Sequence, residues 1–279
     1  MLALMIATVF SAGFGLVLRA AQGRRCNLWA VGLVNYVLAA AINAVRHVPV
    51  GDWTPSPSTL PLGIVSGVLY AFNFWLYFTL IRKRGVSITT AIVRLAVLVP
   101  ILGSIFLWRE SADGTQAAGV VLAVMALPLL TLGDGQGARM ERDVLWASLA
   151  MLAGSGLSML TVEAFEQLAP PSESALFLAI LFGSAMVVTL ASWLRHRAGS
   201  AWADLPFGIA LGLCNTISNV GLVAALQQLP GMIVFPLYSV GGVVVASVAA
   251  RFLWQERLTR LEATGVAVAL AAVVLMNLG

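Results

Sequence analysis

The stretch Phe106-Leu107-Trp108-Arg109-Glu110 recurs 146 residues later as Phe252-Leu253-Trp254-Gln255-Glu256. The same offset, without a gap, also pairs residues elsewhere in the chain: Asn73 with Asn219, Gly85 with Gly231, Val99 with Val245, Gly119 with Gly265 and Ala126 with Ala272. One shared pentapeptide can arise by chance, but several matches in one register indicate an internal duplication. The sequence therefore predicts two copies of one structural unit.

Both copies consist of apolar runs long enough to cross a membrane. Hydrophobic residues make up 60% of the 279 residues and charged residues only 10%, whereas a soluble domain has about 25% charged residues. A spanning helix needs roughly 20 apolar residues. Such runs lie near 2–18, 28–45, 60–81, 87–107, 115–132, 144–162, 174–194, 205–226, 231–252 and 261–278. The sequence predicts an all-α integral membrane protein with ten transmembrane helices.

The two copies are expected to face opposite ways across the membrane. Residues 1–137 and 138–279 each hold five spans, and an odd number makes the second copy enter from the other side. Loop charge agrees, because the basic segment 82–84 corresponds, to within one residue, to the uncharged segment 227–229. We therefore expect one membrane domain built from two inverted five-helix repeats.

The positions of the basic residues predict the orientation. All Arg and Lys residues except Arg46, Arg94 and Arg109 fall in the odd-numbered connections between spans or, for Arg251, at the end of the span that leads into one. Basic loops are retained in the cytoplasm, so we expect cytoplasmic odd-numbered loops and both termini outside, in a multi-pass protein of the inner (cytoplasmic) membrane. The first apolar run precedes its first positive charge, Arg19, which is the reverse of the order in a cleaved signal peptide.

These features resemble the drug/metabolite transporter superfamily, specifically its ten-helix EamA-type members. The resemblance covers almost the whole chain and rests on residues 85–133, with Pro100, Trp108-Arg109-Glu110 and Gly119, and on their echo over 231–279. It implies transport of small solutes by alternating access, often export of amino acids, metabolites or drugs. It also implies a central cavity, with the fifth and tenth helices set apart to support the fold or dimer contacts. Many relatives keep both termini in the cytoplasm, whereas the charges here predict the reverse.

Polar side chains inside predicted spans are the default candidates for a substrate site, because a polar group in hydrocarbon needs a partner. Arg94 lies inside the fourth span and could anchor an anionic group of the substrate, or could extend its side chain to the cytoplasmic headgroups. Asn73 and Asn219 are related by the repeat and are expected on opposite walls of one cavity. Their amides suit a polar or zwitterionic solute, although Asn also cross-links membrane helices.

Further polar and aromatic residues surround these levels and could bind substrate, pack the helices or form an interfacial aromatic belt. They are Asn215, Ser218, Tyr70, Trp75, Tyr77 and Tyr238. The small residues Gly13 and Gly156 occupy corresponding levels of the first and sixth spans. They allow close backbone approach, either in a moving gate or in static packing.

Two prolines inside spans are candidate hinges. Pro100 and Pro236 each remove a backbone hydrogen bond and favour a kink, and Gly241 and Gly242 add a second soft point in the ninth span. These residues are expected either to allow one half to rock against the other or to hold fixed kinks.

Neither a catalytic site nor a cofactor site is indicated. Both histidines, His47 and His196, lie at span edges, and we find no metal-binding or paired-carboxylate motif. No Asp or Glu lies deep in a predicted span, Glu163 being close to the end of the sixth. This disfavours export driven by a membrane-embedded carboxylate, while facilitated diffusion, exchange and coupling through Glu163 stay open.

The sequence therefore predicts a secondary transporter or facilitator for a small organic solute: an amino acid, another metabolite or a drug-like compound. The alternative is a flippase for a lipid or a lipid-linked sugar, which would have a groove open sideways to the bilayer. Expected partners are the small-molecule substrate, the lipid bilayer and a second copy in a homodimer. The net charge of +4 is spread over the connections, so nucleic acid is not an expected partner.

Overall fold

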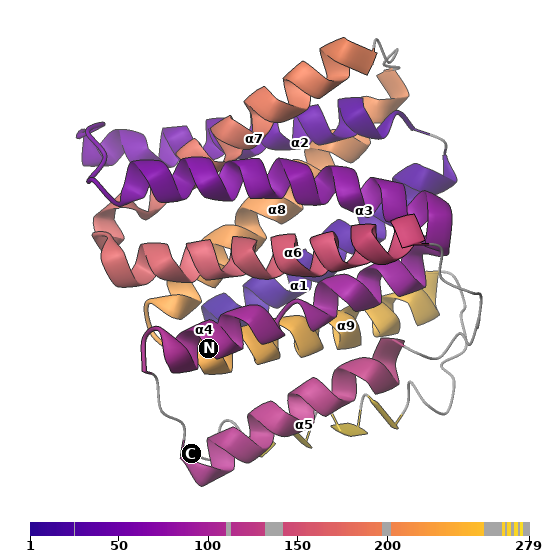
Figure 1. The fold of residues 1–279 in the computed structure, drawn as a ribbon. Coiled ribbons are helices and arrows are strands. Elements are labelled where there is room, and N and C mark those ends of the chain that lie inside the picture. The colour runs from indigo at the N-terminus through magenta and orange to yellow at the C-terminus, as the bar shows by residue number, and fades with distance from the viewer. Residues whose placement is uncertain are drawn as a thin grey trace. The chain divides into compact units, whose positions relative to one another are not determined.

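The computed structural model describes residues 1–24, 26–109, 113–131, 142–196 and 202–253, together with 264–265, 267–268, 271–272 and 274–275. Over these residues the chain is all-helical (Figure 1). The α-helices of this part of the chain are α1 (Leu2–Gly23), α2 (Leu28–His47), α3 (Thr59–Leu95), α4 (Leu98–Phe106), α5 (Gly114–Thr131), α6 (Arg142–Leu168), α7 (Ser174–His196), α8 (Leu205–Leu226) and α9 (Gly231–Leu253).

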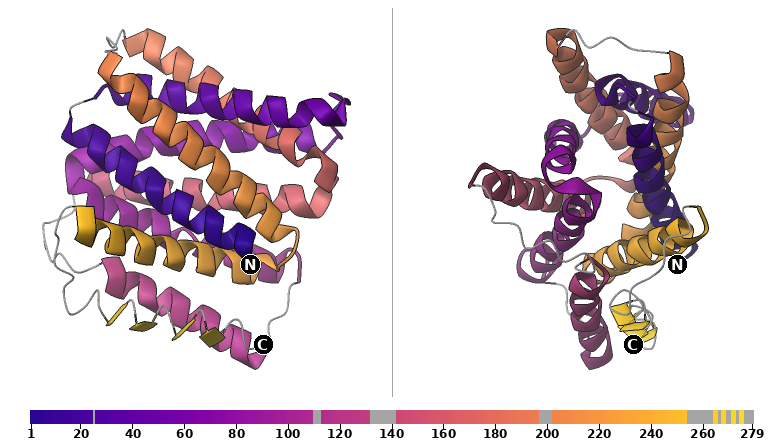
Figure 2. Two further views of the ribbon diagram at one scale, coloured as in Figure 1. Left: turned by 180° about the vertical axis from the view of Figure 1, so that it is seen from behind. Right: turned by 90° about the vertical axis from the view of Figure 1, so that its right-hand side faces the viewer.

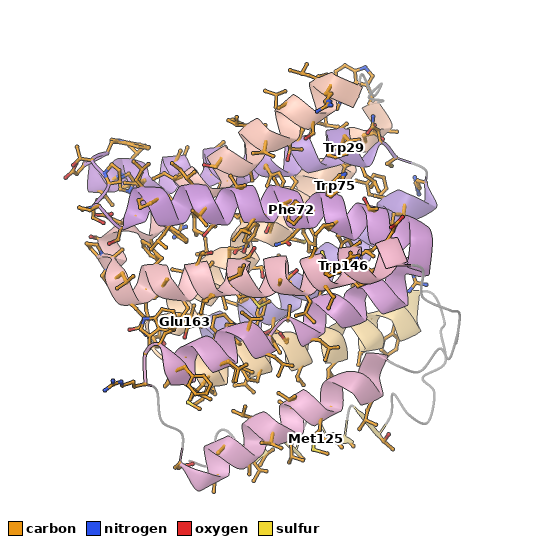
Figure 3. All side chains as sticks on the ribbon, viewed as in Figure 1. Trp29, Phe72, Trp75, Met125, Trp146 and Glu163 are labelled. Carbon is orange, nitrogen blue, oxygen red and sulfur yellow. The ribbon has the colours of Figure 1, made fainter. Side chains whose placement is uncertain are left out.

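The helices have the length and composition of membrane spans. Six segments of the described residues are long and apolar enough to cross a bilayer: Leu2–Gly23, Leu28–Val50, Thr59–Tyr77, Trp146–Leu168, Pro171–Arg195 and Trp202–Leu226. In α1 the buried residues Leu4 and Ala7 alternate with the exposed residues Leu2, Met5 and Val9. A helix that is apolar on both its packed and its exposed face suits a lipid environment, and Met125 on α5 is exposed in the same way (Figure 3). The chain is an all-helical, multi-pass membrane protein.

Most predicted spans coincide with helices. The predicted runs 115–132, 205–226 and 231–252 differ from α5, α8 and α9 by one residue at most at each end. The tenth predicted span, 261–278, lies mostly outside the described residues, and those of its residues that are described are helical.

The predicted division between the third and fourth spans is wrong as a helix boundary. Segment 82–85 does not end a helix, because α3 continues to Leu95 and the interruption falls at Ala96 and Val97. Arg and Lys favour helix, and one Gly disfavours it by only about 1 kcal/mol. Pro100 lies in the first turn of α4, where its ring would clash with a helical carbonyl four residues earlier, at Ala96. This proline therefore accompanies the break between two helices and does not kink the middle of one.

The chain divides into two compact units, each of which draws on both halves of the sequence. Unit 1 comprises residues 1–74 and 161–227, and unit 2 comprises residues 75–160 and 228–279. In unit 2 an apolar cluster forms around Leu76, Leu80 and Met151. The predicted repeats, 1–137 and 138–279, divide the chain by sequence and not by contact, so they stay a prediction.

Within unit 1, α8 lies between two helices of the first half of the sequence. It packs against both α1 and α2, and α2 packs in turn against α7. Figure 2, in its left view, shows α8 in orange running beside α1 in indigo.

The connections of unit 1 show that α2 and α7 run in opposite directions. At the start of α2, the backbone N–H of Asn27 donates at 3.2 Å to Asp204 Oδ1, in the connection from α7 to α8. Beyond the end of α2, the backbone N–H of Ser56 donates to Glu173 Oε2 at 3.1 Å, just before α7 begins. Each end of α2 is thus close to the opposite end of α7.

A glycine pair lets α3 approach α7 closely. A Cβ added to Gly63 would lie 2.8 Å from Ile180 Cγ2, and one added to Gly67 would lie 2.6 Å from Ser184 Cβ and collide with the Leu181 carbonyl oxygen. The two glycines are four residues apart and so share one face of α3. Side chains larger than hydrogen do not fit at these two positions without a shift of α7.

A second glycine pair lets α8 approach α2 in the same manner. A Cβ on Gly208 would lie 2.5 Å from Val34 Cβ, and one on Gly212 would lie 3.1 Å from Leu38 Cβ and 3.0 Å from the Asn35 carbonyl oxygen. This spacing of two glycines allows close helix contact in membranes.

The two glycine interfaces correspond residue by residue. The glycines of α8 meet three residues of α2: Val34, Asn35 and Leu38. The glycines of α3 meet the three residues of α7 that lie 146 positions later: Ile180, Leu181 and Ser184. The glycines themselves are 145 residues apart, Gly63 with Gly208 and Gly67 with Gly212. Residues of α3 and α8 that occupy equivalent places are therefore 145 positions apart, one fewer than the 146 of the sequence repeat. With this offset Asn219 is equivalent to Phe74 and not to Asn73, and Asn215 is equivalent to Tyr70.

Candidate functional site

An aromatic cluster in unit 1 brings together α2, α3 and α7. Tyr36 and Phe182, which are 146 residues apart in sequence, stack with ring centroids 6.4 Å apart and an interplanar angle of 27°. Phe74 packs edge-on against Tyr36 at 6.0 Å, and Tyr70 packs edge-on against Phe182 at 6.1 Å. These contacts hold the two tyrosines in defined orientations.

Tyr70 starts a chain of hydrogen bonds that crosses from α3 to α8 and then to α2. Its Oη donates to Asn219 Oδ1 at 2.6 Å. Asn219 Nδ2 donates at 2.9 Å to both the carbonyl oxygen and Oδ1 of Asn215, one turn earlier on α8. Asn215 Nδ2 then donates to Asn35 Oδ1 on α2 at 3.2 Å. We call these four residues the amide network.

The amide network is buried within apolar helices. Asn35 is 0% exposed, Asn219 5% and Asn215 9%. Tyr70 is half-buried, and its carbonyl oxygen accepts a hydrogen bond of 3.1 Å from Tyr36 Oη. Buried polar groups are costly unless they are hydrogen-bonded, so the network is stable as a connected set.

One polar atom of the amide network has no partner among the residues that the structure describes. Asn35 Nδ2 is buried and makes no hydrogen bond to any of them. Both of its N–H groups are therefore available, while Asn35 Oδ1 accepts a hydrogen bond from Asn215. An uncharged donor at this depth can accept a ligand oxygen or an ordered water as its partner.

The structure thus brings together four of the predicted substrate residues in unit 1. Tyr70, Asn215 and Asn219 belong to the amide network, and Ser218 lies beside them on α8. The Ser218 hydroxyl donates to the Ala7 carbonyl oxygen on α1 at 2.9 Å. This bond joins two helices, which favours the packing interpretation of Ser218.

The other predicted substrate residues are not part of this network. Asn73 is half-buried in α3, Trp75 is exposed on the same helix (Figure 3), and Tyr238 is half-buried in α9. Tyr77 packs against the apolar cluster of unit 2. Arg94 belongs to α3, but its side chain lies outside the described residues, so both interpretations of Arg94 stay predictions.

The small residues predicted as gates lie at close helix contacts. A Cβ on Gly13 would lie 3.3 Å from Cys214 Sγ on α8, and one on Gly156 would lie 2.5 Å from Val99 Cγ2 in unit 2. Pro236 lies inside α9 and is buried, as is Gly242, while Gly241 is half-buried. Tight packing accounts for the two contacts, and gating or hinge motion at all of these positions stays a prediction.

Sequence reasoning missed Asn35, Tyr36 and the burial of Glu163. Asn35 and Tyr36 lie within the second predicted span, where the rule for intramembrane polar residues applies to them as it does to Asn219. The predicted sixth span stops at 162, but α6 continues to Leu168 and Glu163 is only 1% exposed (Figure 3). Glu163 is thus buried in the protein near the end of α6, and the expectation that no carboxylate lies deep in a span stays a prediction.

Known proteins share both the sequence pattern and the fold. Residues 1–132 match the profile of the EamA-like transporter family. An uncharacterized protein of Haemophilus influenzae is 23% identical over 226 residues, which cover 80% of this chain and 77% of that protein. A protein of known crystal structure has the same fold, with a TM-score of 0.76 and 14% identity over 99% of this chain and 98% of the other. The resemblance to the EamA-like transporter family of the drug/metabolite transporter superfamily is thus confirmed over residues 1–132.

Proposed function

We propose that this protein is a secondary transporter or facilitator that moves a small organic solute across the cytoplasmic membrane by alternating access. The solute is an amino acid, another metabolite or a drug-like compound. The observation that carries this proposal is the amide network, a buried polar cluster between apolar helices of a chain whose first 132 residues match a transporter family. Polar residues at membrane depth are expensive and mark substrate pathways by default.

Alternating access needs two halves that can exchange roles, and we propose that the repeats 1–137 and 138–279 are these halves. The opposite directions of α2 and α7 support an inverted arrangement. So do the reciprocal glycine interfaces and the stacking of the equivalent residues Tyr36 and Phe182. Inverted repeats allow the same contacts to form on either side of a substrate site.

Transport and lipid translocation make different predictions in proteoliposomes. Uptake is measured for four solute classes (amino acids, nucleosides, organic acids and quaternary amines), and lipid translocation is measured with a fluorescent phospholipid. We expect saturable uptake of a solute by the wild-type protein and a loss of about tenfold or more in kcat/KM for Asn219→Ala. Arg94→Ala tests the predicted anion anchor, because it should weaken the uptake of anionic solutes alone.

Asn43→Ala is a matched control for this screen. Asn43 is a buried asparagine of α2 that donates to the Ala39 carbonyl oxygen of its own helix and accepts from Arg46. Its removal should leave the KM unchanged within about twofold. Lipid translocation without uptake of any solute would replace the transporter proposal by the flippase alternative.

A pH gradient imposed on the wild-type protein and on Glu163→Gln tests proton coupling through the buried Glu163. If uptake is coupled through this residue, uptake by the variant should no longer depend on the gradient.

A further inference from the structure

The two glycine interfaces have the same geometry but opposite chemistry. Asn35 on α2 faces Gly212, and its equivalent on α7, Leu181, faces Gly67. In the same way, Tyr70 is equivalent to Asn215, while Phe74 on α3 is equivalent to Asn219. The three asparagines of the amide network thus belong to α2 and α8. At the three equivalent positions of α7 and α3, two residues are apolar, Leu181 and Phe74, and the third is Tyr70.

This difference argues that the asparagines are not needed to hold the helices together. An interface of the same backbone geometry forms with Leu181 in place of Asn35 and with Phe74 in place of Asn219. Small residues at a helix interface supply close packing by themselves. The polar side chains at the interface of α2 with α8 therefore call for a role besides packing.

The hydrogen bonds of the amide network all run in one direction. Tyr70 donates to Asn219, Asn219 to Asn215, and Asn215 to Asn35. Every side-chain oxygen of the three amides is thus already an acceptor. Asn35 Nδ2 is buried, and it is the amide nitrogen of the network that donates no hydrogen bond to any described residue.

We propose that Asn35 Nδ2 binds a carboxylate oxygen of the substrate and that this contact selects solutes with a carboxyl group. The inference rests on the proposed transport function and names the substrate class for it. The unsatisfied group of the amide network is a hydrogen-bond donor, and a donor recognises an acceptor such as an oxygen atom. A carboxylate is the strongest oxygen acceptor among small metabolites, because hydrogen bonds to an ionised group are about twice as strong as neutral ones.

The test compares amino acids with amines that lack only the carboxyl group. Proteoliposomes are loaded with a mixture of the twenty L-amino acids, or with the amines that result from their decarboxylation, and flux is followed by mass spectrometry. The wild-type protein should transport one or more amino acids and favour each over its amine by at least tenfold in kcat/KM. Equal transport of acid and amine would overturn the inference while the transport function stands. No flux of any solute in either this assay or the four-class screen would overturn the proposed function itself.

Two substitutions at Asn35 test the contact directly. Asn35→Leu introduces the residue that the equivalent position already carries, Leu181, and should raise the KM for the transported acid about 10- to 100-fold with a smaller change in kcat. Asn35→Asp keeps the side-chain shape and the acceptor for Asn215 but removes the amide donors, so it should lose acid uptake as well. A KM within about twofold of wild type in either variant would contradict the inference.

The Asn35 variants are paired with Asn43→Ala, which changes an asparagine of α2 outside the amide network and should keep the wild-type KM. Size-exclusion profiles and melting temperatures in detergent show which variants fold. If Asn35→Leu aggregates, Asn35→Asp carries the test, because its shape is that of the native side chain. Stabilisation by the transported acid should raise the melting temperature of wild type and Asn43→Ala but not that of Asn35→Asp, and an equal rise in all three would also overturn the inference.

Discussion

The hydrogen bond from Tyr70 Oη to Asn219 Oδ1 joins α3 to α8 at 2.6 Å, and its loss should be measurable as stability. Tyr70→Phe leaves the buried Asn219 oxygen without its donor, and an unsatisfied buried group costs about 1–3 kcal/mol. Asn219→Ala removes the acceptor together with both donations to Asn215. In a double-mutant cycle followed by unfolding in detergent, we expect a coupling energy of about 1 kcal/mol.

The matched cycle combines Tyr70→Phe with Asn43→Ala. Asn43 bonds within its own helix and to Arg46, so its effect should add to that of Tyr70→Phe within about 0.5 kcal/mol. Additive effects of Tyr70→Phe and Asn219→Ala would show that the Tyr70–Asn219 bond contributes nothing to the fold.

At the residue scale, the sequence could indicate which positions carry polar groups at membrane depth but not which of them meet. The rule for intramembrane polar residues selected Tyr70, Asn215 and Asn219, and it applies equally to Asn35. The ungapped repeat suggested Asn73 as the counterpart of Asn219. The glycine contacts instead pair Asn219 with Phe74, because the register shifts by one residue between the second and third helices of each copy. A one-residue shift turns a helical position by about 100°, so it decides which side chains face each other.

At the element scale, close helix contact should depend on the glycines of α3. An added Cβ at Gly67 would collide with the Leu181 carbonyl oxygen, and a backbone atom cannot move aside as a side chain can. Gly67→Ala should therefore destabilise the protein by about 1–3 kcal/mol, the range for overpacking a tight contact. The measurement is the melting temperature in detergent.

Gly183→Ala on α7 is the control for Gly67→Ala. None of the described residues has an atom within 4 Å of a Cβ added at Gly183, so the variant should be neutral or stabilised by up to about 1 kcal/mol through its helix propensity. Equal melting temperatures for the two variants would mean that α3 and α7 do not approach each other as closely as described.

The predicted helix ends were correct where the sequence has strong helix-breaking residues and wrong where it has none. Pro230 immediately precedes α9, which begins at Gly231, and Asp204 precedes α8, which has Pro206 in its first turn. These residues allowed both helix starts to be predicted from the sequence. Segment 82–85 offered only basic charge and one glycine, neither of which stops a helix. Hydropathy therefore located the helices. Their ends depended on prolines and capping residues, and charged residues alone do not end a helix.

At the scale of the whole molecule, the predicted orientation is open to a direct test by cysteine labelling. We propose that odd-numbered loops are cytoplasmic and both termini outside. The loop contacts of unit 1 support such an alternation, because Asn27 and Asp204 join the first and seventh connections, whereas Ser56 and Glu173 join the second and sixth. Contacts thus link odd-numbered connections with odd and even-numbered with even, as expected if each of the ten predicted spans crosses the membrane.

Single cysteines at Ser56 and Ala138 report the two sides, after Cys26→Ser and Cys214→Ala have removed the native thiols. Burial, together with Asp204 beside it, raises the pKa of the Cys26 thiol. Fewer thiolates at neutral pH make this native cysteine slow to react, but it would still add background. In intact cells a membrane-impermeant maleimide should label Ser56→Cys and leave Ala138→Cys unlabelled until the cells are broken. The reverse pattern would place both termini in the cytoplasm, and labelling of both sites from outside would contradict the odd number of spans in each copy, on which the inverted arrangement depends.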